Sequence, residues 1–415
     1  MHKFLLTLIL VFSLIACDID DEIQIVENEN AVDDSSMVNI IEEEEHEHDE
    51  EKDHEHDEEK DHEHEDEKDH DHEEEHEHEE EKDHEHEEEH ELSFSHYVEE
   101  FGTQGLLNIE KLDDIDLSWP REVEAMNGKI IIEEEPKRIL TISVGHDEML
   151  FGFADIDTIV AVSSFSQSET GNIYDLTKDL PTISSEIETI IAQDPDLVFA
   201  DPYANPSLIQ SLKDVGITVV QTQLNNDYIG RINDILFTSY VIGQTENVSK
   251  LISVIEEKIS IIDEFKSRFD KKPSVLSVTY YDAYWAAGVG STEGSIIELA
   301  GGLNIASENG VESNNMITKE SLIDMNPEYI VIPQSIAWGG QDFYDTLFSD
   351  ESFQSIEAII NNNVYLVDTS YFTTLSHWNI VGAEKLMGII WGDEWNKVVG
   401  DLPEFYSCMN CDIYN

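Results

Sequence analysis

The chain has 415 residues, of which 93 are Asp or Glu and 22 are Lys or Arg, so its formal net charge at pH 7 is −71. A chain this acidic is repelled by nucleic acid and by anionic lipid headgroups, and we therefore expect no nucleic-acid partner. The region after residue 91 has enough aliphatic and aromatic residues to form a hydrophobic core.

Residues 1–17 have the pattern of an export signal. A lysine at position 3 is followed by an apolar run from Phe4 to Ile15, which is too short to span a bilayer stably. The sequence from Leu14 to Cys17 resembles the lipobox of bacterial lipoproteins, in which the cysteine is lipidated and becomes the mature N-terminus. This predicts an extracytoplasmic protein anchored to the cell membrane through lipid on Cys17. An ordinary secretory signal with an incidental cysteine is the alternative.

Residues 18–91 are predicted to be a disordered, acidic, His-rich linker. Within it, residues 42–91 contain 33 acidic residues, four lysines and 13 of the 17 histidines, with almost no apolar side chains to bury. The motif Glu-Lys-Asp-His occurs four times, and each time a second histidine stands two positions after the first. Imidazoles paired in this way among carboxylates suit Zn²⁺, Ni²⁺, Co²⁺ or Cu²⁺. We expect weak multisite metal capture, with a solvated spacer as the alternative. The paired histidines are His54, His56, His62, His64, His70, His72, His84 and His86.

A lead-in segment, residues 92–135, is predicted to end in a β-hairpin whose turn is Asn127-Gly128. Residues 136–245 then alternate short apolar runs with helical patterns, which predicts an N-terminal α/β lobe. Its first strand ends near Ser143, and Asp147 is the expected N-cap of the next helix. His146 would lie in the turn between them, at the carboxyl end of a strand, where open α/β sheets bind ligands.

A long helix is predicted over residues 246–272. Apolar residues recur every three or four positions from Val248 to Phe269, and Pro273 forbids a further turn. A second alternating region, residues 273–415, predicts a C-terminal lobe and tail. The expected fold class is therefore α/β, with two lobes joined by a single long backbone helix and a ligand cleft between them.

A faint internal repeat supports the expectation of two related lobes. In each lobe a helix is predicted to end before a proline, Pro195 or Pro327, and a buried strand follows. A glutamate stands seven positions before each proline, Glu188 in the first lobe and Glu320 in the second.

From about residue 119 to residue 395, the chain resembles the substrate-binding proteins of ABC importers for ferric siderophores, haem and cobalamin. This resemblance implies a monomeric receptor that carries a metal ion or metal chelate to an ABC permease and its ATPase, without a catalytic cofactor. It also implies that Glu188 and Glu320 engage arginines of the permease. The motifs that carry the resemblance are Pro136-Lys137-Arg138-Ile139, Ser143 with Glu148, Asp194-Pro195-Asp196, Gly290-Ser291, Ile297 to Gly302 and Asn326-Pro327-Glu328.

The loops predicted to follow the strands contain aromatic residues but no lysine or arginine, which favours a neutral or cationic ligand over anionic ferric catecholates. His146 and His377 come from opposite lobes and are predicted to approach one metal centre across the cleft, although a structural role is the alternative for each. Aromatic residues would equally stack on a corrin or another flat chelate. The predicted aromatic ligand contacts are Tyr203, Tyr281, Trp285, Trp338 and Trp378.

Two functions other than transport are the alternatives. An enzyme is not expected, because the sequence contains no His-Glu-x-x-His, Gly-x-Ser-x-Gly or phosphate-loop motif. A metal-buffering or interaction protein that acts mainly through the His-rich tail is the stronger rival. Cys408 and Cys411 are expected to form a disulfide in an oxidising compartment, with a metal or redox pair as the alternative.

Overall fold

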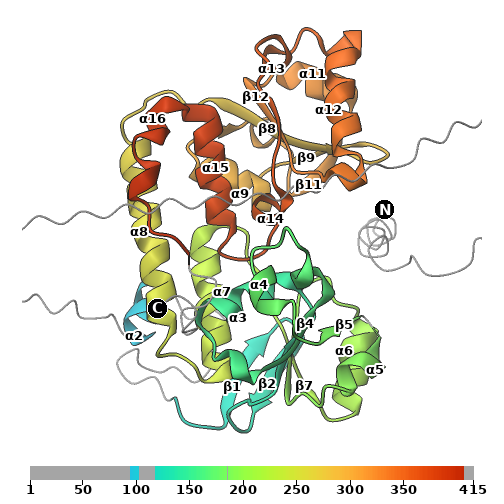
Figure 1. The fold of residues 1–415 in the computed structure, drawn as a ribbon, viewed down its shortest axis with the longest axis vertical. Helices are drawn as coiled ribbons and strands as arrows, with labels where there is room; N and C mark the ends of the chain where they lie inside the picture. Colours follow the sequence, from blue (N-terminus) through green and yellow to red (C-terminus); the bar gives the residue numbers. More distant parts are fainter. Residues whose placement is uncertain (1–93, 102–116, 185, 406–415) are drawn as a thin grey trace, which may run out of the picture. The chain divides into compact units, whose positions relative to one another are not determined.

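The computed structural model describes residues 94–101, 117–184 and 186–405 (Figure 1). The predicted signal peptide with Cys17, the histidine repeats and the Cys408–Cys411 pair lie outside these ranges. All described residues belong to one compact unit. Over these ranges, no helix is both long enough and apolar enough to cross a membrane.

The N-terminal lobe is built on a parallel five-stranded sheet in the order β5-β4-β3-β6-β7. The central strands β3 and β6 are buried throughout, as expected where helices cover both faces of a parallel sheet. The strands are β3 (Ile139–Thr141), β4 (Ile159–Ser163), β5 (Thr182–Ile183), β6 (Leu197–Ala200) and β7 (Thr218–Gln221), and the helices are α3 (Val144–Phe153), α4 (Tyr174–Thr177), α5 (Ile187–Ile191), α6 (Pro206–Asp214) and α7 (Tyr228–Ile242).

An antiparallel hairpin, β1 (Arg121–Ala125) with β2 (Gly128–Ile132), precedes this sheet. Asn127, in its turn, fastens the hairpin to the edge strand β7. Its side-chain Nδ2 donates to Val219 O at 2.8 Å, and its Oδ1 accepts from Gln221 N at 3.1 Å. Helix α2 (Phe94–Phe101), which was not predicted from the sequence, packs near α8, where the Tyr97 hydroxyl lies 3.0 Å from Ser253 Oγ.

The C-terminal lobe has a mixed sheet in the order β11-β9-β8-β12-β13, with β10 paired to β8. Strands β8, β12 and β13 are parallel, whereas β8, β9 and β11 pair antiparallel. The strands are β8 (Ser274–Tyr280), β9 (Tyr284–Ala287), β10 (Leu303–Asn304), β11 (Asn314–Ile317), β12 (Tyr329–Ile332) and β13 (Val364–Leu366), and the helices are α9 (Thr292–Leu299), α10 (Ile305–Glu308), α11 (Lys319–Met325), α12 (Gly340–Ser349), α13 (Glu357–Ile360), α14 (Thr369–Phe372), α15 (Asn379–Trp391) and α16 (Asp393–Asn396).

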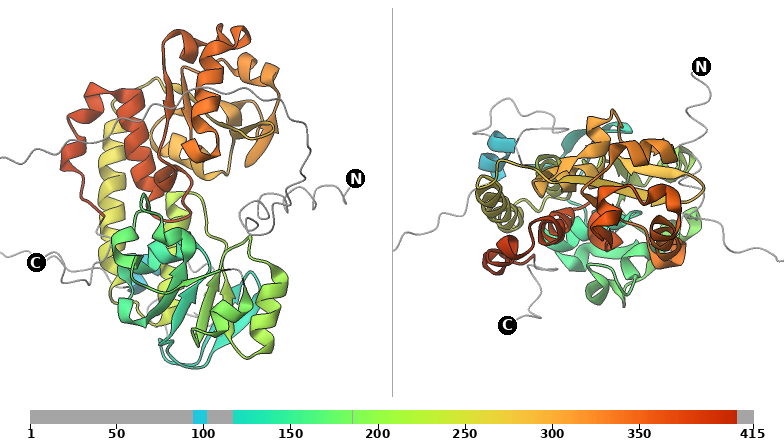
Figure 2. Two further views of the ribbon diagram at one scale, coloured as in Figure 1. Left: turned by 45° about the vertical axis from the view of Figure 1, so that its right-hand side comes forward. Right: turned by 90° about the horizontal axis from the view of Figure 1, so that it is seen from above.

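A long helix, α8 (Val248–Lys266), connects the two lobes, so the predicted fold class is the one observed (Figure 1). Its 19 residues span about 28 Å. The face bearing Leu251, Ile255 and Ile262 is buried in a core that also includes residues of α3, α7 and α15. Helix α15 lies beside α8 in both views of Figure 2, and Lys258 of α8 forms a buried ion pair with Glu384 at 2.8 Å.

Candidate functional site

Loops at the carboxyl ends of the strands leave several large apolar side chains exposed. Phe165 and Tyr203 follow β4 and β6 in the N-terminal lobe. Tyr281, Ile336 and Trp338 follow β8 and β12 in the C-terminal lobe. Their exposed fractions run from 43% for Tyr281 to 71% for Ile336. Exposed apolar side chains on loops at the carboxyl ends of strands are typical of a binding surface. We refer to these five residues as the rim residues.

The rim residues include three of the aromatic contacts predicted from the sequence, Tyr203, Tyr281 and Trp338. The other two lie elsewhere. Trp285 is half-buried within β9, opposite Thr279 of β8 and Met316 of β11, and so belongs to a strand and not to a loop. Trp378 is half-buried at the start of α15, where its ring lies 5.7 Å from that of Phe405.

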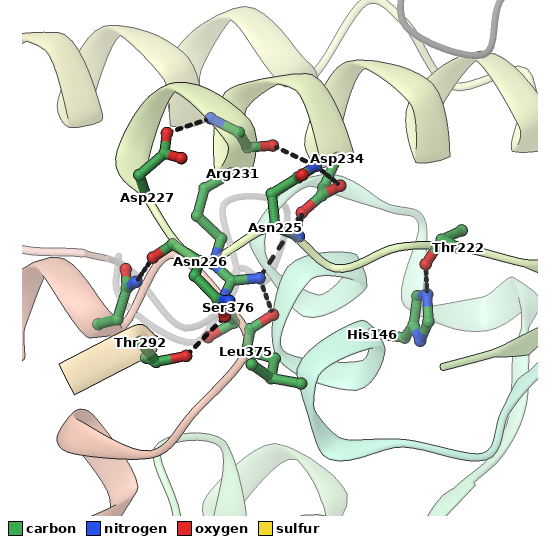
Figure 3. A network of polar contacts seen from close by, with 12 residues as sticks. His146, Thr222, Asn225, Asn226, Asp227, Arg231, Asp234, Thr292, Leu375 and Ser376 are labelled. Atoms are coloured by element: carbon green, nitrogen blue, oxygen red, sulfur yellow. Dashed lines mark hydrogen bonds and ion pairs between the residues drawn. The ribbon is translucent and has the colours of Figure 1, made fainter. Parts of the chain in front are cut away.

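His146 is fully buried inside the N-terminal lobe, in contrast to its predicted place in a turn. Helix α3 begins four residues earlier than expected, because Ser143 and not Asp147 is its N-cap, and this puts His146 in the first turn of the helix. Its Nδ1 lies 2.8 Å from Ser143 Oγ, and its Nε2 lies 2.7 Å from Thr222 Oγ1 (Figure 3). Burial, reinforced by the positive charge of Arg231, lowers the pKa of His146 to about 3. The neutral ring therefore joins α3 to the end of β7.

His377 is also buried, 1% exposed, just before α15. Its ring meets the Phe405 ring edge-on at 4.9 Å and lies close to Gly152 of α3. Neither ring nitrogen has a hydrogen-bond partner among the described residues. Burial, followed by the charges of Arg231 and Lys258, lowers the pKa of His377 to about 3.

The predicted pair of imidazoles open to a cleft is therefore not present. Both rings are buried, and each has its own packing environment. In the part of the chain that the structure describes, no group of three or more His, Cys, Asp and Glu side chains is placed to hold a metal ion. These observations leave the rim residues as the candidate ligand contacts.

Buried acids next to His146 organise the loops around it. Asp147 accepts hydrogen bonds from Thr141, from Ser163 N at 2.8 Å and from Ser166 Oγ at 2.7 Å. Burial outweighs these bonds and raises the pKa of Asp147 to about 7. Asp147 thus fixes the segment after β4 that presents Phe165.

Glu148 and Arg231 connect the N-terminal lobe to a loop of the other lobe. Glu148 accepts hydrogen bonds from the hydroxyls of Thr374 and Ser376. Arg231, on α7, donates from Nη1 to Leu375 O at 2.6 Å, and the same Nη1 lies 3.6 Å from Asp234 Oδ2 (Figure 3). Burial is the main cause of the raised pKa of Glu148. Sequence patterns did not indicate this role for either residue, although Asp147 and Glu148 stand out as acids in an otherwise apolar helix.

Asn226, in the loop between β7 and α7, makes a second contact between the lobes. Its Nδ2 donates to Gly290 O at 2.8 Å, and its Oδ1 accepts from Thr292 Oγ1 at 2.7 Å (Figure 3). Asn379 Nδ2 donates to Asn226 O at 3.1 Å. Asn226 thus joins the loop after β7 to the residues between β9 and α9 of the other lobe.

Two cavities of the described residues lie away from the rim residues. One, of about 210 Å³, is beside the Asn226 contact, and the other, of about 350 Å³, is on the C-terminal lobe. Neither is lined by a rim residue, so we do not assign them to the candidate site. The first is lined by Asn226, Asp227, Tyr228, Lys266, Ser295, Ile296, Glu298, Leu299 and Asn379, and the second by Tyr344, Asp345, Phe348, Ser349 and Asn362.

Glu188 and Glu320 occupy corresponding places in the two lobes. Each is exposed in the first turn of a short helix, α5 or α11. Across the described ranges, neither carboxylate forms an ion pair within the chain. Both carboxylates are therefore accessible to solvent.

Known proteins share both sequence and fold with this chain. The cobalamin-binding protein of Halobacterium salinarum is 25% identical over 216 residues, which cover 51% of this chain and 57% of that protein. An uncharacterized ABC transporter substrate-binding lipoprotein of Bacillus subtilis, YvrC, is 21% identical over 280 residues, which cover 66% of this chain and 86% of that protein. The chain thus spans little more than half the length of the first of these relatives.

Among solved structures, the periplasmic haem-binding protein HutB of Vibrio cholerae superposes with a TM-score of 0.54 at 20% identity, covering 61% of this chain and 98% of that one. This similarity shows that the fold is shared. A family model described as periplasmic binding protein matches residues 139–371, which is more than half of the chain. On this evidence the chain belongs to the periplasmic binding protein family.

Proposed function

We propose that this protein is the extracytoplasmic substrate-binding component of an ABC importer, and that it captures a metal chelate between its two lobes and delivers it to a permease. The observation that carries the proposal is the set of exposed rim residues on loops of both lobes. Two interlobe hydrogen bonds support it, one that Asn226 donates to Gly290 O and one that Glu148 accepts from Ser376, because they connect segments of the two lobes.

A large, flat organic chelate suits these side chains best. Tyr281 and Trp338 in one lobe and Phe165 and Tyr203 in the other offer aromatic faces, on which a macrocycle can stack. The relative named for cobalamin and the structural neighbour named for haem both bind ligands of this shape. With His146 and His377 buried, the metal of the ligand would be held by its own chelate and not by protein imidazoles.

The charge around Tyr281 favours a neutral or cationic chelate. Burial, and after it the negative charge of Glu293, raise the pKa of the Tyr281 hydroxyl. Glu293 is itself buried, and its carboxylate accepts a 3.4 Å hydrogen bond from Asn314 Nδ2. An anionic ligand would approach this carboxylate at an electrostatic cost.

Attachment to the membrane and to the transporter completes the proposed function. Lipid on Cys17 would hold the protein at the extracytoplasmic face of the membrane. The acidic linker would let the lobes move some distance from this anchor. Glu188 and Glu320 would then form one ion pair per lobe with permease arginines. Two separated ion pairs suit this role, because both form only when the lobes have the correct relative orientation.

Titration of the full chain tests the binding proposal. Tryptophan fluorescence is followed as cyanocobalamin, haemin, a ferric catecholate and free Ni²⁺ are added in turn. We expect a macrocyclic chelate to bind most tightly, and Trp338→Ala or Tyr281→Ala to weaken it about tenfold, as for other buried aromatic contacts. Tyr344→Ala, which alters a cavity away from the rim residues, is the matched control. Equal affinity of the rim variants and the wild type would refute the assignment.

A further inference from the structure

A short stretch of the C-terminal lobe, Thr374 to Ser376, is held at each of its three residues by the N-terminal lobe. The side chains of Thr374 and Ser376 donate to one oxygen of Glu148, and the backbone oxygen of Leu375 accepts from Arg231. We call this stretch the docked segment. It lies between α14 and α15, in the connection that follows strand β13.

The backbones also approach closely here. A Cβ atom placed on Gly145, in the first turn of α3, would lie 2.9 Å from Leu375 O, closer than ordinary packing allows. Asn172 extends the contact, because its Nδ2 donates at 2.8 Å both to Glu148 Oε1 and to Ser370 O. The docked segment therefore rests directly on the N-terminal lobe and is not separated from it by a layer of side chains.

Two opposite charges converge on this segment without pairing directly with each other. Glu148 is 3% exposed and Arg231 is fully buried. A buried charge is stable only where hydrogen bonds or opposite charges compensate it, and here much of that compensation comes from the other lobe. Displacing the docked segment would remove both hydroxyl donors from the Glu148 carboxylate and leave it the hydrogen bond from Asn172. This makes the contact costly to open.

We propose that Glu148 and Arg231 are positioning residues, which set the placement of the two lobes by fixing the docked segment onto α3 and α7. The rim residues of the two lobes are held at a defined separation as a result. The consequence for ligand affinity rests on the proposed function, whereas the effect on lobe placement does not. The long helix α8 limits the bending between the lobes, and this contact selects one arrangement within that limit.

Single-molecule energy transfer on the full chain tests the inference without any ligand. Dyes are attached through unnatural amino acids at Val215 and Ile360, which are 56% and 64% exposed on the N-terminal and C-terminal lobes. Glu148→Gln and Thr374→Val should broaden the distribution of inter-dye distances. The matched controls should leave it unchanged: Thr374→Ser keeps the hydroxyl donor, and Glu186→Gln alters an exposed glutamate of the same lobe.

Hydrogen exchange read by mass spectrometry gives a second measurement. Amides of residues 373–379 should exchange at least tenfold faster in Glu148→Gln, with β6 unaffected. Ser376→Ala combined with Glu148→Gln should add little to the single variant, because both remove one contact. A lowered melting temperature with unchanged inter-dye distances and unchanged exchange would reduce Glu148 to a purely structural role and overturn the inference. Weaker binding of cyanocobalamin or haemin with unchanged distances would overturn it as well.

Discussion

The two buried histidines are expected to make the stability of the protein depend on pH. Unfolding returns each imidazole to its ordinary pKa of about 6.5, whereas burial lowers the pKa in the folded protein to about 3. Between these values the unfolded chain binds the proton and the folded protein does not. The contribution of each histidine is therefore complete above pH 6.5 and is lost as the pH falls. Over this range, each histidine should lower the free energy of unfolding by roughly 1 kcal/mol for each unit by which the pH falls.

Two buried acids act in the opposite direction. The pKa of Asp147 is raised to about 7 and that of Asp234 to about 6, in both cases chiefly by burial. The folded protein then holds these protons at a pH at which the unfolded chain has released them. Protonation of these two acids thus stabilises the protein as the pH falls from about 7 towards 4, and a variant must be compared with the wild type at each pH to isolate a histidine.

His377→Leu should flatten this pH dependence. Removing a buried ring without hydrogen-bond partners should cost little at pH 7, and should remove roughly 1 kcal/mol per pH unit of acid destabilisation between pH 6.5 and 4. Urea denaturation at several pH values measures the difference from the wild type. His96→Leu, at an exposed histidine, is the control. Parallel curves for His377→Leu and the wild type would contradict the lowered pKa.

At the same scale, the sequence identified the loops but not the direction of the side chains. Tyr203 and Tyr281 lie in loops as expected, because each follows a recognisable strand, whereas Trp338 ends a short 3-10 helix, Ile336–Trp338, after β12. The predicted placement of His146 was wrong. Ser143 and Asp147 are both suitable N-cap residues, and the sequence does not show which of them caps the helix; in the structure it is Ser143. The buried contact of Glu148 with Ser376 joins residues 228 positions apart, so it cannot be predicted from local sequence patterns.

Among the elements, α8 was predicted best. Its apolar face, repeating over five turns, is a strong signal, and the observed bounds, Val248–Lys266, fall inside the predicted range. Trp285 was predicted to lie in a loop, but it belongs to strand β9. The turn between β8 and β9 contains Asp282 and lacks the Asn-Gly signal of a tight turn, so the sequence does not indicate a hairpin there. Helix α2 was missed, because its eight residues are too few to show a clear period.

Ile255→Ala tests how much the connecting helix contributes to stability. Ile255 is fully buried in α8, so truncation removes apolar contacts and leaves a cavity, which should cost about 2–5 kcal/mol of unfolding free energy. Glu257→Ala, on the exposed face of the same helix, should change stability by about 0.5 kcal/mol or less. Urea denaturation of both variants provides the measurement, and an equal loss in the two would argue against a core role for this face.

For the whole molecule, docking onto a permease is separable from ligand binding. Glu188→Lys and Glu320→Lys should each impair uptake by cells, because the reversed charge repels a permease arginine. Affinity in solution should stay as in the wild type, since both residues are exposed on helices away from the rim residues. Glu186→Lys, at the exposed N-cap of α5, is the matched control. Normal uptake by the double reversal would exclude the docking role.

Whether the lobes or the His-rich tail hold the transported ligand is the decisive question. Native mass spectrometry can compare the full chain with a chain that lacks residues 42–91, each purified without chelators from cells of its own host. We predict that both forms carry the same added mass of a metal chelate, and that metal ions bound in addition are confined to the full chain. A chelate retained by the full chain and absent from the shortened one would show that the tail, and not the pair of lobes, is the binding element.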